Sequence, residues 1–438
     1  MKLSKFFTVV QIKNDVFAVY NRLVMDVIFV TTDELAEIRN LNFEPNLLKE
    51  KGIYIENDII DSYAYEQLKK QYLNESTNLH IMYLILTTSC NLACKYCYIE
   101  NNICNNKVEH SMTKATAHLA IDRYIDHLKN AGLTTAEIIL YGGEPLTNWE
   151  CVKEIAKYTK ERTKNANIKI VISMVTNGTL LDETKADFIA EYGLRVGISI
   201  DGPKQINDEN RIYRTSNNSV YDKVLETVAL LNHKKIDFGF SITLSNTFIN
   251  NKDAVIEWLK QMQVNGIAYN LYHFSENNDD WEKVYNDQSE FLIESFEKLY
   301  ESKGLVEDRQ YRKLESFKDY KFKFSDCASV GCNQITVRPD GILSICHCYS
   351  KTDKYIIGNI YDMTFDDAIL SSEATFWKYR APIFDNECLN CEGIFICGGG
   401  CPAQGEALFG DRKNIDRPFC IHTKKSLKWL LKKLYETS

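Results

Sequence analysis

Apolar positions in the middle of the chain, from residue 81 to about residue 274, follow two alternating patterns. Short runs rich in β-branched and aromatic residues, expected to be strands, are separated by longer amphipathic stretches, expected to be helices. Strands that alternate with helices in this way pair in parallel, with the helices outside. The pattern therefore predicts an α/β region with six strands, at residues 81–88, 137–141, 169–175, 195–200, 238–244 and 267–273.

The first 78 residues follow a different pattern and are predicted to form a separate small module. Three β-rich runs, at 7–12, 16–20 and 27–31, are divided by turn residues. Thr32 and Asp33 can cap a helix that begins at Glu34, and a second short helix is predicted to end before Gly52. A long polar-faced helix is also predicted at 281–303, between the α/β region and the end of the chain.

Composition narrows the class of protein. At 438 residues, with 45% hydrophobic and 26% charged residues, the chain is an ordinary globular protein with more than one domain. A net charge of −8 disfavours a nucleic-acid partner, because phosphate backbones are normally met by a basic surface. No apolar run reaches the ~20 residues of a membrane helix, and the first residues turn polar too soon for a signal peptide. We therefore expect a cytoplasmic protein without a membrane partner.

Fourteen cysteines in such a chain indicate metal ligation, because the cytosol keeps thiols reduced. Cys90, Cys94 and Cys97 follow the first predicted strand with the spacing C-x3-C-x2-C. Three thiolates on a [4Fe–4S] cube leave one iron open to another ligand. Zinc is the alternative, although it prefers paired C-x2-C units and four protein ligands.

This stretch, with Tyr96 as a ring beside the cluster, resembles the signature of the radical S-adenosylmethionine (SAM) enzymes. The resemblance implies a partial (β/α)6 barrel with its chemistry at the carboxyl ends of the strands. It also implies that SAM binds the open iron and is cleaved to a 5′-deoxyadenosyl radical that removes a hydrogen atom from the substrate.

Further motifs at the predicted strand ends resemble the SAM pocket of that family. Gly142, Gly143 and Glu144 match its GGEP motif, in which the backbone and the glutamate meet the amino group of SAM. An ordinary Gly-Gly turn is the alternative. The resemblance also implicates Thr176 and Asn177 after the third strand, Ser199 and Asp201 after the fourth, and Arg211 or Arg214 for the carboxylate of SAM. Either arginine could equally lie on the surface.

Eight cysteines near the end of the chain resemble a SPASM domain, the cysteine-rich extension of one radical SAM subgroup. Their spacing is C-x13-G-x4-C, then C-x2-C-x5-C-x3-C, then a single cysteine, with one more cysteine inside the first interval. The resemblance, applied position by position, implies that the first auxiliary [4Fe–4S] cluster is bound by Cys327, Cys332, Cys346 and Cys401. The second would use Cys388, Cys391, Cys397 and Cys420. Zinc at Cys388, Cys391, Cys397 and Cys401 is the alternative.

Three [4Fe–4S] clusters are thus expected, and three cysteines are left over. Cys151 has the helical spacing of a small core residue, and Cys104 is expected to be an inert loop thiol. Cys348, two residues after Cys346, could approach a substrate. The simpler expectation is that it has no part in metal binding or catalysis.

The domain boundaries expected from these motifs are 1–78, 79–305 and 306–438. Three strands followed by small helices resemble the winged-helix module with which many radical SAM peptide maturases bind a leader peptide, through strand addition to a sheet edge. A structural cap over the barrel is the alternative.

The resemblance implies that the protein is a peptide maturase. It would form a thioether, carbon–carbon or carbon–oxygen crosslink in a ribosomally made precursor peptide. A reductant such as flavodoxin or ferredoxin would be its electron donor. Anaerobic sulfatase maturases share these motifs but carry an aspartate directly after the cysteine corresponding to Cys346, where this chain has His347. His347 is the predicted catalytic residue, because histidine can accept a proton near neutral pH. A sulfatase maturase and a non-catalytic iron–sulfur scaffold remain alternatives.

Overall fold

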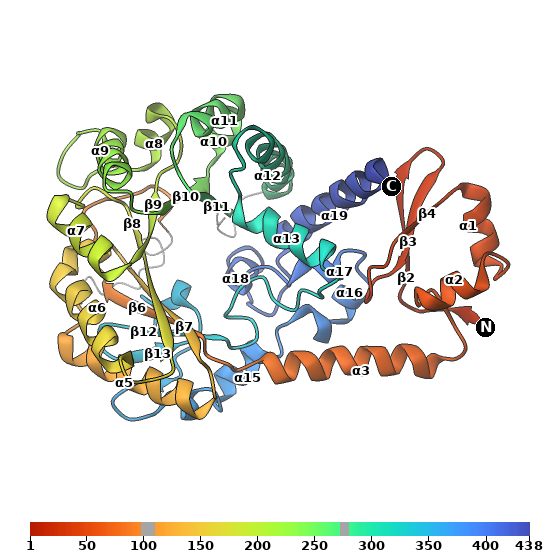
Figure 1. Ribbon diagram of the computed structural model, residues 1–438, viewed down its shortest axis with the longest axis horizontal. Helices are drawn as coiled ribbons and strands as arrows, with labels where there is room; N and C mark the ends of the chain where they lie inside the picture. The colour runs from red at the N-terminus through yellow and green to blue at the C-terminus, as the bar shows by residue number, and fades with distance from the viewer. Residues whose placement is uncertain (98–109, 272–279) are drawn as a thin grey trace.

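A nine-stranded sheet dominates one end of the molecule in the computed structural model, which describes residues 1–97, 110–271 and 280–438 (Figure 1). Six consecutive strands pair in parallel and carry the order β11-β10-β9-β8-β7-β6. Their bounds are β6 Ile81–Thr87, β7 Thr135–Gly142, β8 Lys169–Thr176, β9 Arg195–Ser199, β10 Phe238–Leu244 and β11 Gly266–Leu271. The six predicted strands are confirmed to within two residues, and residues 272 and 273 lie outside the described part of the chain.

Helices cover one face of these strands. Met82, Leu84 and Leu86 of β6 are buried in the core that the helices close, whereas the alternate residue Tyr83 is half-buried on the opposite face. This face is the inside of the open barrel. The helices are α5 Lys114–Asn130, α6 Trp149–Thr163, α7 Glu183–Tyr192, α8 Lys204–Asn210, α9 Val220–His233, α10 Asn246–Asn250 and α11 Lys252–Gln261, with a 3₁₀ turn, η1, at Pro145–Asn148.

The last three strands of the sheet come from the C-terminal part of the chain. β12 (Gln334–Val337) and β13 (Ile342–Ser344) form the hairpin expected at the Asp-Gly turn, where Gly341 has φ +83°. β12 also pairs in parallel with β6, in the register Gln334↔Ile81, and β14 (Gly358–Asn359) closes the edge. This extension of the barrel sheet was not predicted from the sequence.

The N-terminal module contains the three predicted strands as an antiparallel sheet of β2 (Phe7–Lys13), β3 (Val16–Asn21) and β4 (Ile28–Val30). The predicted helix cap was wrong by one residue. Thr31, not Thr32 or Asp33, caps α1 (Thr32–Arg39), because Thr31 and Glu34 form a reciprocal capping box. The module is completed by α2 (Pro45–Glu50) and by β1 (Lys2–Leu3), which pairs with β5 (Tyr54–Ile55).

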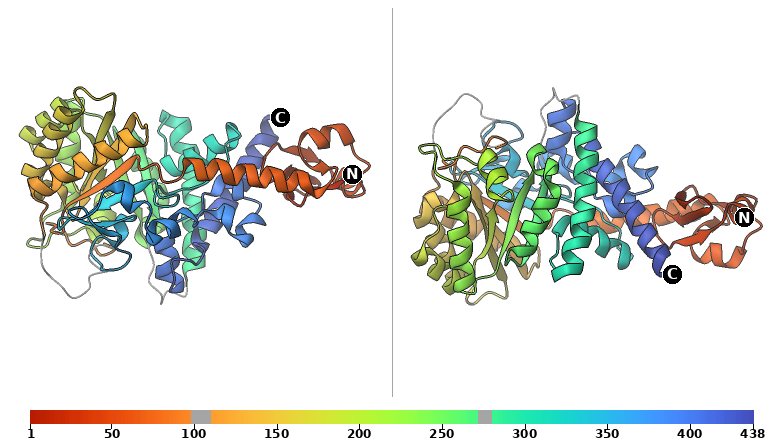
Figure 2. Two further views of the ribbon diagram at one scale, coloured as in Figure 1. Left: turned by 90° about the horizontal axis from the view of Figure 1, so that it is seen from below. Right: turned by 90° about the horizontal axis from the view of Figure 1, so that it is seen from above.

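Helices fill the space between the two ends of the elongated molecule, as Figures 1 and 2 show. α3 (Asp58–Glu75) runs from the module to the barrel, while α12 (Trp281–Lys303), α13 (Asp308–Lys318) and α19 (Arg417–Thr437) lie between them. Shorter elements lie among the C-terminal cysteines: η2 His347–Tyr349, α14 Phe365–Ala368, α15 Ser372–Lys378, η3 Pro382–Phe384, α16 Asn386–Leu389, α17 Ile394–Cys397 and α18 Pro402–Phe409. Within the described residues, no helix has the length and apolar character needed to cross a membrane.

Candidate active site

The loop that carries Cys90, Cys94 and Cys97 leaves the carboxyl end of β6 and is held against the end of β7. Gly143 and Glu144 donate backbone hydrogen bonds to the carbonyls of Thr87 and Ser89, both at 2.9 Å. A Cβ on Gly143 would collide with the Ser89 carbonyl oxygen. The glycines were predicted to let the backbone approach a ligand closely. In the structure they also let the end of β7 pack directly on the cysteine loop.

The cysteines of this loop lie in a buried, polar setting. Burial raises the pKa of the Cys90 thiol to about 12 and that of Cys94 to about 11, and Arg211 opposes the shift at Cys94. The Asn177 amide lies 3.9 Å from Cys90 Sγ, and Arg211 Nη1 lies 4.0 Å from Cys94 Sγ. The positive charge of a bound metal would oppose this rise and favour the thiolate form.

Glu144 is buried at the end of β7, and its carboxylate joins two strand ends. It accepts hydrogen bonds from Thr176 Oγ1 at 2.6 Å, from the Asn177 backbone at 2.8 Å and from the Leu146 backbone at 3.0 Å. Burial raises its pKa, and these donors oppose the rise. A carboxylate has about four acceptor positions, so roughly one is left for a further donor such as an ammonium group.

Asp201 and Arg211 form a buried ion pair beside the cysteine loop. Arg211 Nε and Nη2 contact the two oxygens of Asp201 at 3.0 and 3.2 Å. The Tyr96 hydroxyl donates to Asp201, and the Arg211 guanidinium lies 5.5 Å from the centre of the Tyr96 ring. These three predicted site residues are therefore brought together, with the positive charge of Arg211 largely shared with Asp201.

Arg214 and Ser199 lie at the rim of this region. Arg214 is exposed and its Nε donates to the Cys90 carbonyl at 2.8 Å. Ser199 is the last residue of β9 and is half-buried on the inner face of the strand. The predicted SAM-pocket residues thus gather at the carboxyl ends of β7, β8 and β9 around the three cysteines.

Cys388, Cys391, Cys397 and Cys420 form a second group of thiols, in the C-terminal part. Burial raises the pKa of Cys388, Cys391 and Cys420, and the charges of neighbouring thiols in the group raise it further. Cys388 lies in α16, Cys391 in the turn that follows it, Cys397 at the end of α17 and Cys420 in the first turn of α19. The structure therefore collects the full set predicted for the second auxiliary cluster.

A third group is collected only in part. Burial raises the pKa of Cys401, and the charges of Cys346 and Cys327 add to the rise. Cys332 is buried, but its charge interactions are with Lys378 and Glu373. Cys348 interacts with Cys346, Cys401 and Cys327 instead. Cys348 is thus a neighbour of the predicted first auxiliary site that sequence spacing did not place there.

The spacing of these thiols bears on which metal they fit. Zinc needs its thiolates about 2.3 Å from one ion. Among the described residues, no three His, Cys, Asp or Glu side chains converge in this way. In a [4Fe–4S] cube each thiolate binds a different iron, so the sulfurs stand farther apart. The donor set itself, four thiolates from Cys388, Cys391, Cys397 and Cys420, is one that a [4Fe–4S] cluster takes.

His347 reaches the inside of the barrel from the C-terminal hairpin. Its ring stacks on Tyr83 of β6, with centroids 4.4 Å apart and planes 16° apart, and meets the edge of Tyr141 of β7 at 5.1 Å. Both tyrosines are on the half-buried inner face of their strands. The hairpin thus places an imidazole in the wall of the barrel interior.

The sequence matches the radical SAM superfamily over residues 84–259 and the SPASM iron–sulfur cluster-binding domain over residues 327–392. The chain contains a radical SAM domain and a SPASM domain. The first three cysteines and all predicted SAM-pocket residues fall inside the radical SAM match. Cys397, Cys401 and Cys420 lie beyond the end of the SPASM match.

Two relatives of the chain differ in the share of it that they match. A radical SAM cyclopropyl synthase, TigE of Paramaledivibacter caminithermalis, is 25% identical and covers 94% of this chain and 87% of its own length. A cysteine-type anaerobic sulfatase-maturating enzyme of Clostridium novyi is also 25% identical but covers 76% of this chain and 90% of its own.

Solved structures share the fold. The structure of anSMEcpe with bound AdoMet has a TM-score of 0.70 at 21% identity, and the match covers 81% of this chain and 98% of that one. Streptococcus suis SuiB bound to the precursor peptide SuiA has a TM-score of 0.55 at 11% identity, with 96% and 99% covered.

Several neighbours of the radical SAM and SPASM residues were not predicted from the sequence. Tyr83 and Tyr141 lie in continuously apolar strand runs, so the sequence did not mark which face of the sheet they occupy. The contact of Cys348 with the first auxiliary group depends on the fold of η2 and had no sequence signal either. Cys151 is buried in α6 as predicted, and Cys104 lies outside the described residues.

Proposed function

We propose that the protein is a radical SAM maturase that forms a crosslink in a ribosomally made precursor peptide. The observation that carries the peptide substrate is the N-terminal sheet, in which β2 is an edge strand. A cavity of about 620 Å³ lies along this edge, between β2 and the side chains of Asn390, Glu392 and Lys428. An extended leader segment could add to β2 there through main-chain hydrogen bonds.

The extent of the matches supports the same assignment. TigE and SuiB match 94% and 96% of this chain, and one of the SuiB structures holds a precursor peptide. The sulfatase-maturating enzymes match less of it, and the shortfall is comparable in length with residues 1–78. The module in residues 1–78, the barrel in 79–305 and the cysteine-rich part in 306–438 would then bind leader, SAM and two auxiliary clusters, respectively.

The site residues have defined tasks in this proposal. Cys90, Cys94 and Cys97 would hold the cluster at which SAM supplies the 5′-deoxyadenosyl radical. The free acceptor position of Glu144 would receive the ammonium group of SAM. Arg214, which is exposed and donates to the Cys90 carbonyl, or Arg211, which lies beside Cys94, would meet the SAM carboxylate. Tyr96, Asp201 and Arg211 would hold the cysteine loop in place.

His347 would take the proton that leaves the substrate. Closing a crosslink removes two hydrogen atoms from the peptide: one is abstracted by the radical, and the other departs as a proton and an electron. The position of His347 in the barrel wall, next to Cys346, would put the proton acceptor close to the auxiliary cluster that receives the electron. An external one-electron donor such as flavodoxin or ferredoxin would start each cycle.

A sulfatase maturase is the second candidate, because relatives of that activity match both domains. His347, in place of the aspartate that the resemblance leads one to expect, speaks against it. A scaffold without catalysis is disfavoured by the acceptor position that remains on Glu144, which such a protein would not need.

The first test is the iron and sulfide content of anaerobically reconstituted protein, paired with detection of 5′-deoxyadenosine under reductant. About twelve irons per chain are expected for three cubes, together with SAM cleavage. Peptides then separate the two maturase reactions by mass. A small precursor encoded beside this gene should lose two hydrogen atoms per bond formed, whereas a sulfatase peptide should remain unchanged.

Cys94→Ala is the matching variant. It should retain about eight of about twelve irons and produce no 5′-deoxyadenosine. Cys151→Ala, which alters a buried core thiol in α6, should keep both the iron and SAM cleavage. Continued 5′-deoxyadenosine formation by Cys94→Ala would refute the assignment of the SAM-binding cluster.

A further inference from the structure

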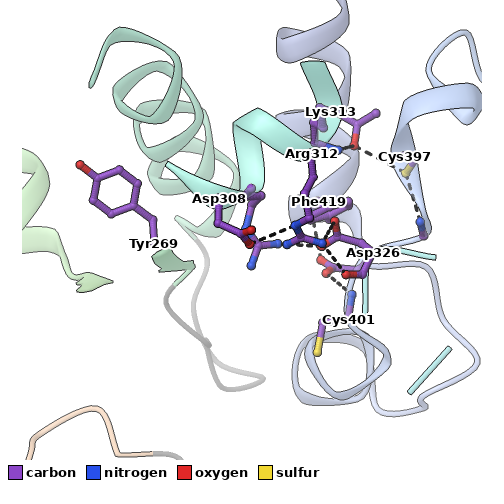
Figure 3. A network of polar contacts seen from close by, with 12 residues as sticks. Tyr269, Asp308, Arg312, Lys313, Asp326, Cys397, Cys401 and Phe419 are labelled. Carbon is purple, nitrogen blue, oxygen red and sulfur yellow. Dashed lines mark hydrogen bonds and ion pairs between the residues drawn. The ribbon is translucent and has the colours of Figure 1, made fainter. Parts of the chain in front are cut away.

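Lys313 on α13 is a completely buried lysine in the polar network that Figure 3 shows. Its ammonium group donates to the Ile396 carbonyl and to Thr423 Oγ1, both at 3.2 Å. The Phe419 ring lies 4.5 Å from Lys313 Nζ. α17 and α19, which supply these groups, pack directly on α13, so the ammonium is held in one place.

No carboxylate in the described part of the chain forms an ion pair with Lys313. The carboxylate of Asp326 is bound instead by Arg309 at 3.0 Å and by Arg312 at 3.3 Å. Burial lowers the pKa of Lys313 to about 8, so the group is still mainly charged at neutral pH. A buried ion without a partner costs several kcal/mol, so a negative charge is expected nearby.

Thr423 connects Lys313 to one of the predicted cluster ligands. Its hydroxyl accepts from the ammonium and donates to Cys397 Sγ at 3.5 Å. Cys397 belongs to the thiol group of Cys388, Cys391 and Cys420. A [4Fe–4S] cube bound by four thiolates carries net negative charge, which is the counter-charge that Lys313 lacks in the protein alone.

We propose that Lys313, acting through Thr423, raises the reduction potential of the cluster that Cys397 binds. The inference rests on the proposed function, because it assumes a cluster at these four cysteines. Reduction adds one electron to a group that is already negative, and no bond is made or broken. Net charge and hydrogen bonds to ligating sulfurs set such potentials. A fixed ammonium linked to one of these sulfurs therefore stabilises the reduced form.

The same network joins the two auxiliary sites. Asp326, whose carboxylate is paired with Arg309 and Arg312, directly precedes Cys327 of the first site, whereas Lys313 lies beside Cys397 of the second. The Asp326 backbone N–H donates to the Gly398 carbonyl at 2.9 Å, so one hydrogen bond connects the two sites. By favouring reduction of the second cluster, Lys313 would make it an acceptor for an electron that the substrate releases near the first.

The test is the midpoint potential of the auxiliary clusters in Lys313→Met, which keeps most of the side-chain volume and removes the charge. The full chain carries Cys90→Ala, Cys94→Ala and Cys97→Ala in addition, so that only the C-terminal clusters titrate. Dithionite, a one-electron reductant, and electron paramagnetic resonance give the two midpoints. One transition should shift to more negative potential, and the other should keep its position.

Lys318→Met is the matched control, because Lys318 lies on the same helix, carries the same charge and is exposed. It should shift neither midpoint. If Lys313→Met moves no transition further than Lys318→Met does, the inference is overturned.

Thr423→Val provides a second test of the same link if the Lys313→Met protein fails to assemble its clusters. Valine has nearly the shape of threonine but cannot donate to Cys397 Sγ. It should shift the same transition in the same direction by a smaller amount, and an unchanged potential would overturn the inference. Absence of iron from the C-terminal cysteines of the unaltered protein would defeat the proposed function instead.

Discussion

Among individual residues, Glu144 and Asp201 stand out because each accepts hydrogen bonds from the protein and also lies where SAM is expected to bind. Each is a buried carboxylate at a strand end where SAM is expected to bind, and each already receives several donors from the protein. A buried carboxylate is tolerated only when it is well hydrogen-bonded. These donors fix the shape of the pocket before any ligand arrives, which limits the reorganisation that binding would require.

His347→Phe should separate the two halves of the proposed reaction. Phenylalanine preserves the ring between Tyr83 and Tyr141 but cannot accept a proton. SAM cleavage should therefore continue at its normal rate, while crosslinked product should fall by about 100-fold or more, the usual effect of losing a general base. Both products can be quantified from the same reaction by liquid chromatography and mass spectrometry.

His118→Phe provides the control for that variant. His118 also stacks on a tyrosine, Tyr158, with centroids 3.8 Å apart, but it lies on α5 outside the barrel. It should leave both products unchanged. Full product yield from His347→Phe would remove His347 from the mechanism.

At the scale of elements, the sequence identified what local patterns determine. The six barrel strands, the three N-terminal strands and the Asp-Gly hairpin were predicted because alternation and turn chemistry are properties of short segments. The pairing of β12 with β6 was missed, because it joins residues about 250 positions apart and leaves no local signal. α3 was missed for another reason, since its apolar residues face both the module and the C-terminal part and make no single stripe.

The candidate site, too, was predicted from the sequence only in part. Motif spacing identified the cysteines and the SAM-pocket residues, but it could not show that Arg211 is paired with Asp201 or that Cys348 lies near Cys401. Those contacts depend on side-chain directions set by the whole fold. The role of each site residue stays a prediction.

Gly398→Ala should disrupt both auxiliary sites together. Gly398 has φ +75°, and a Cβ there would collide with the backbone of Asp326, which no rotamer change can relieve. Because Cys397 and Cys327 flank this contact, the variant should lose about eight of about twelve irons. Iron analysis and absorption at the cluster bands measure the loss.

Gly193→Ala isolates the effect of the contact from that of backbone conformation. Gly193 has a similar φ of +65° at the end of α7, with no atom within 4 Å of an added Cβ. It should cost about 1–2 kcal/mol of stability and no iron. Equal iron in the two variants would show that the Asp326–Gly398 contact does not support the clusters.

At the scale of the molecule, the N-terminal module is anchored to the second auxiliary site. Ala18 and Tyr20 of β3 share a buried core with Phe395 and Ile396 of α17, directly before Cys397. α16 and α17 have only four residues each, so they need a bound group to hold them. The binding module and the clusters are therefore expected to lose order together.

Removal of iron with a chelator should reveal this coupling in hydrogen–deuterium exchange. Exchange should speed up in residues 385–401 and, through the shared core, in β3. β8, in the middle of the sheet, should keep its protection, because its neighbours β7 and β9 remain in place. Faster exchange in β8 to the same degree would indicate general unfolding, and no change in β3 would show that the module stands independently.

The ladder between β12 and β6 has a consequence for electron transfer. β6 leads into the loop of Cys90, and β12 leads through its hairpin to Cys346. The rate of electron tunnelling falls steeply with distance. If the two sites moved relative to each other, the rate of electron transfer between them would vary from one turnover to the next. A shared row of backbone hydrogen bonds would give the two proposed clusters one rigid frame, so that the tunnelling distance between them would stay constant while a peptide substrate enters and leaves.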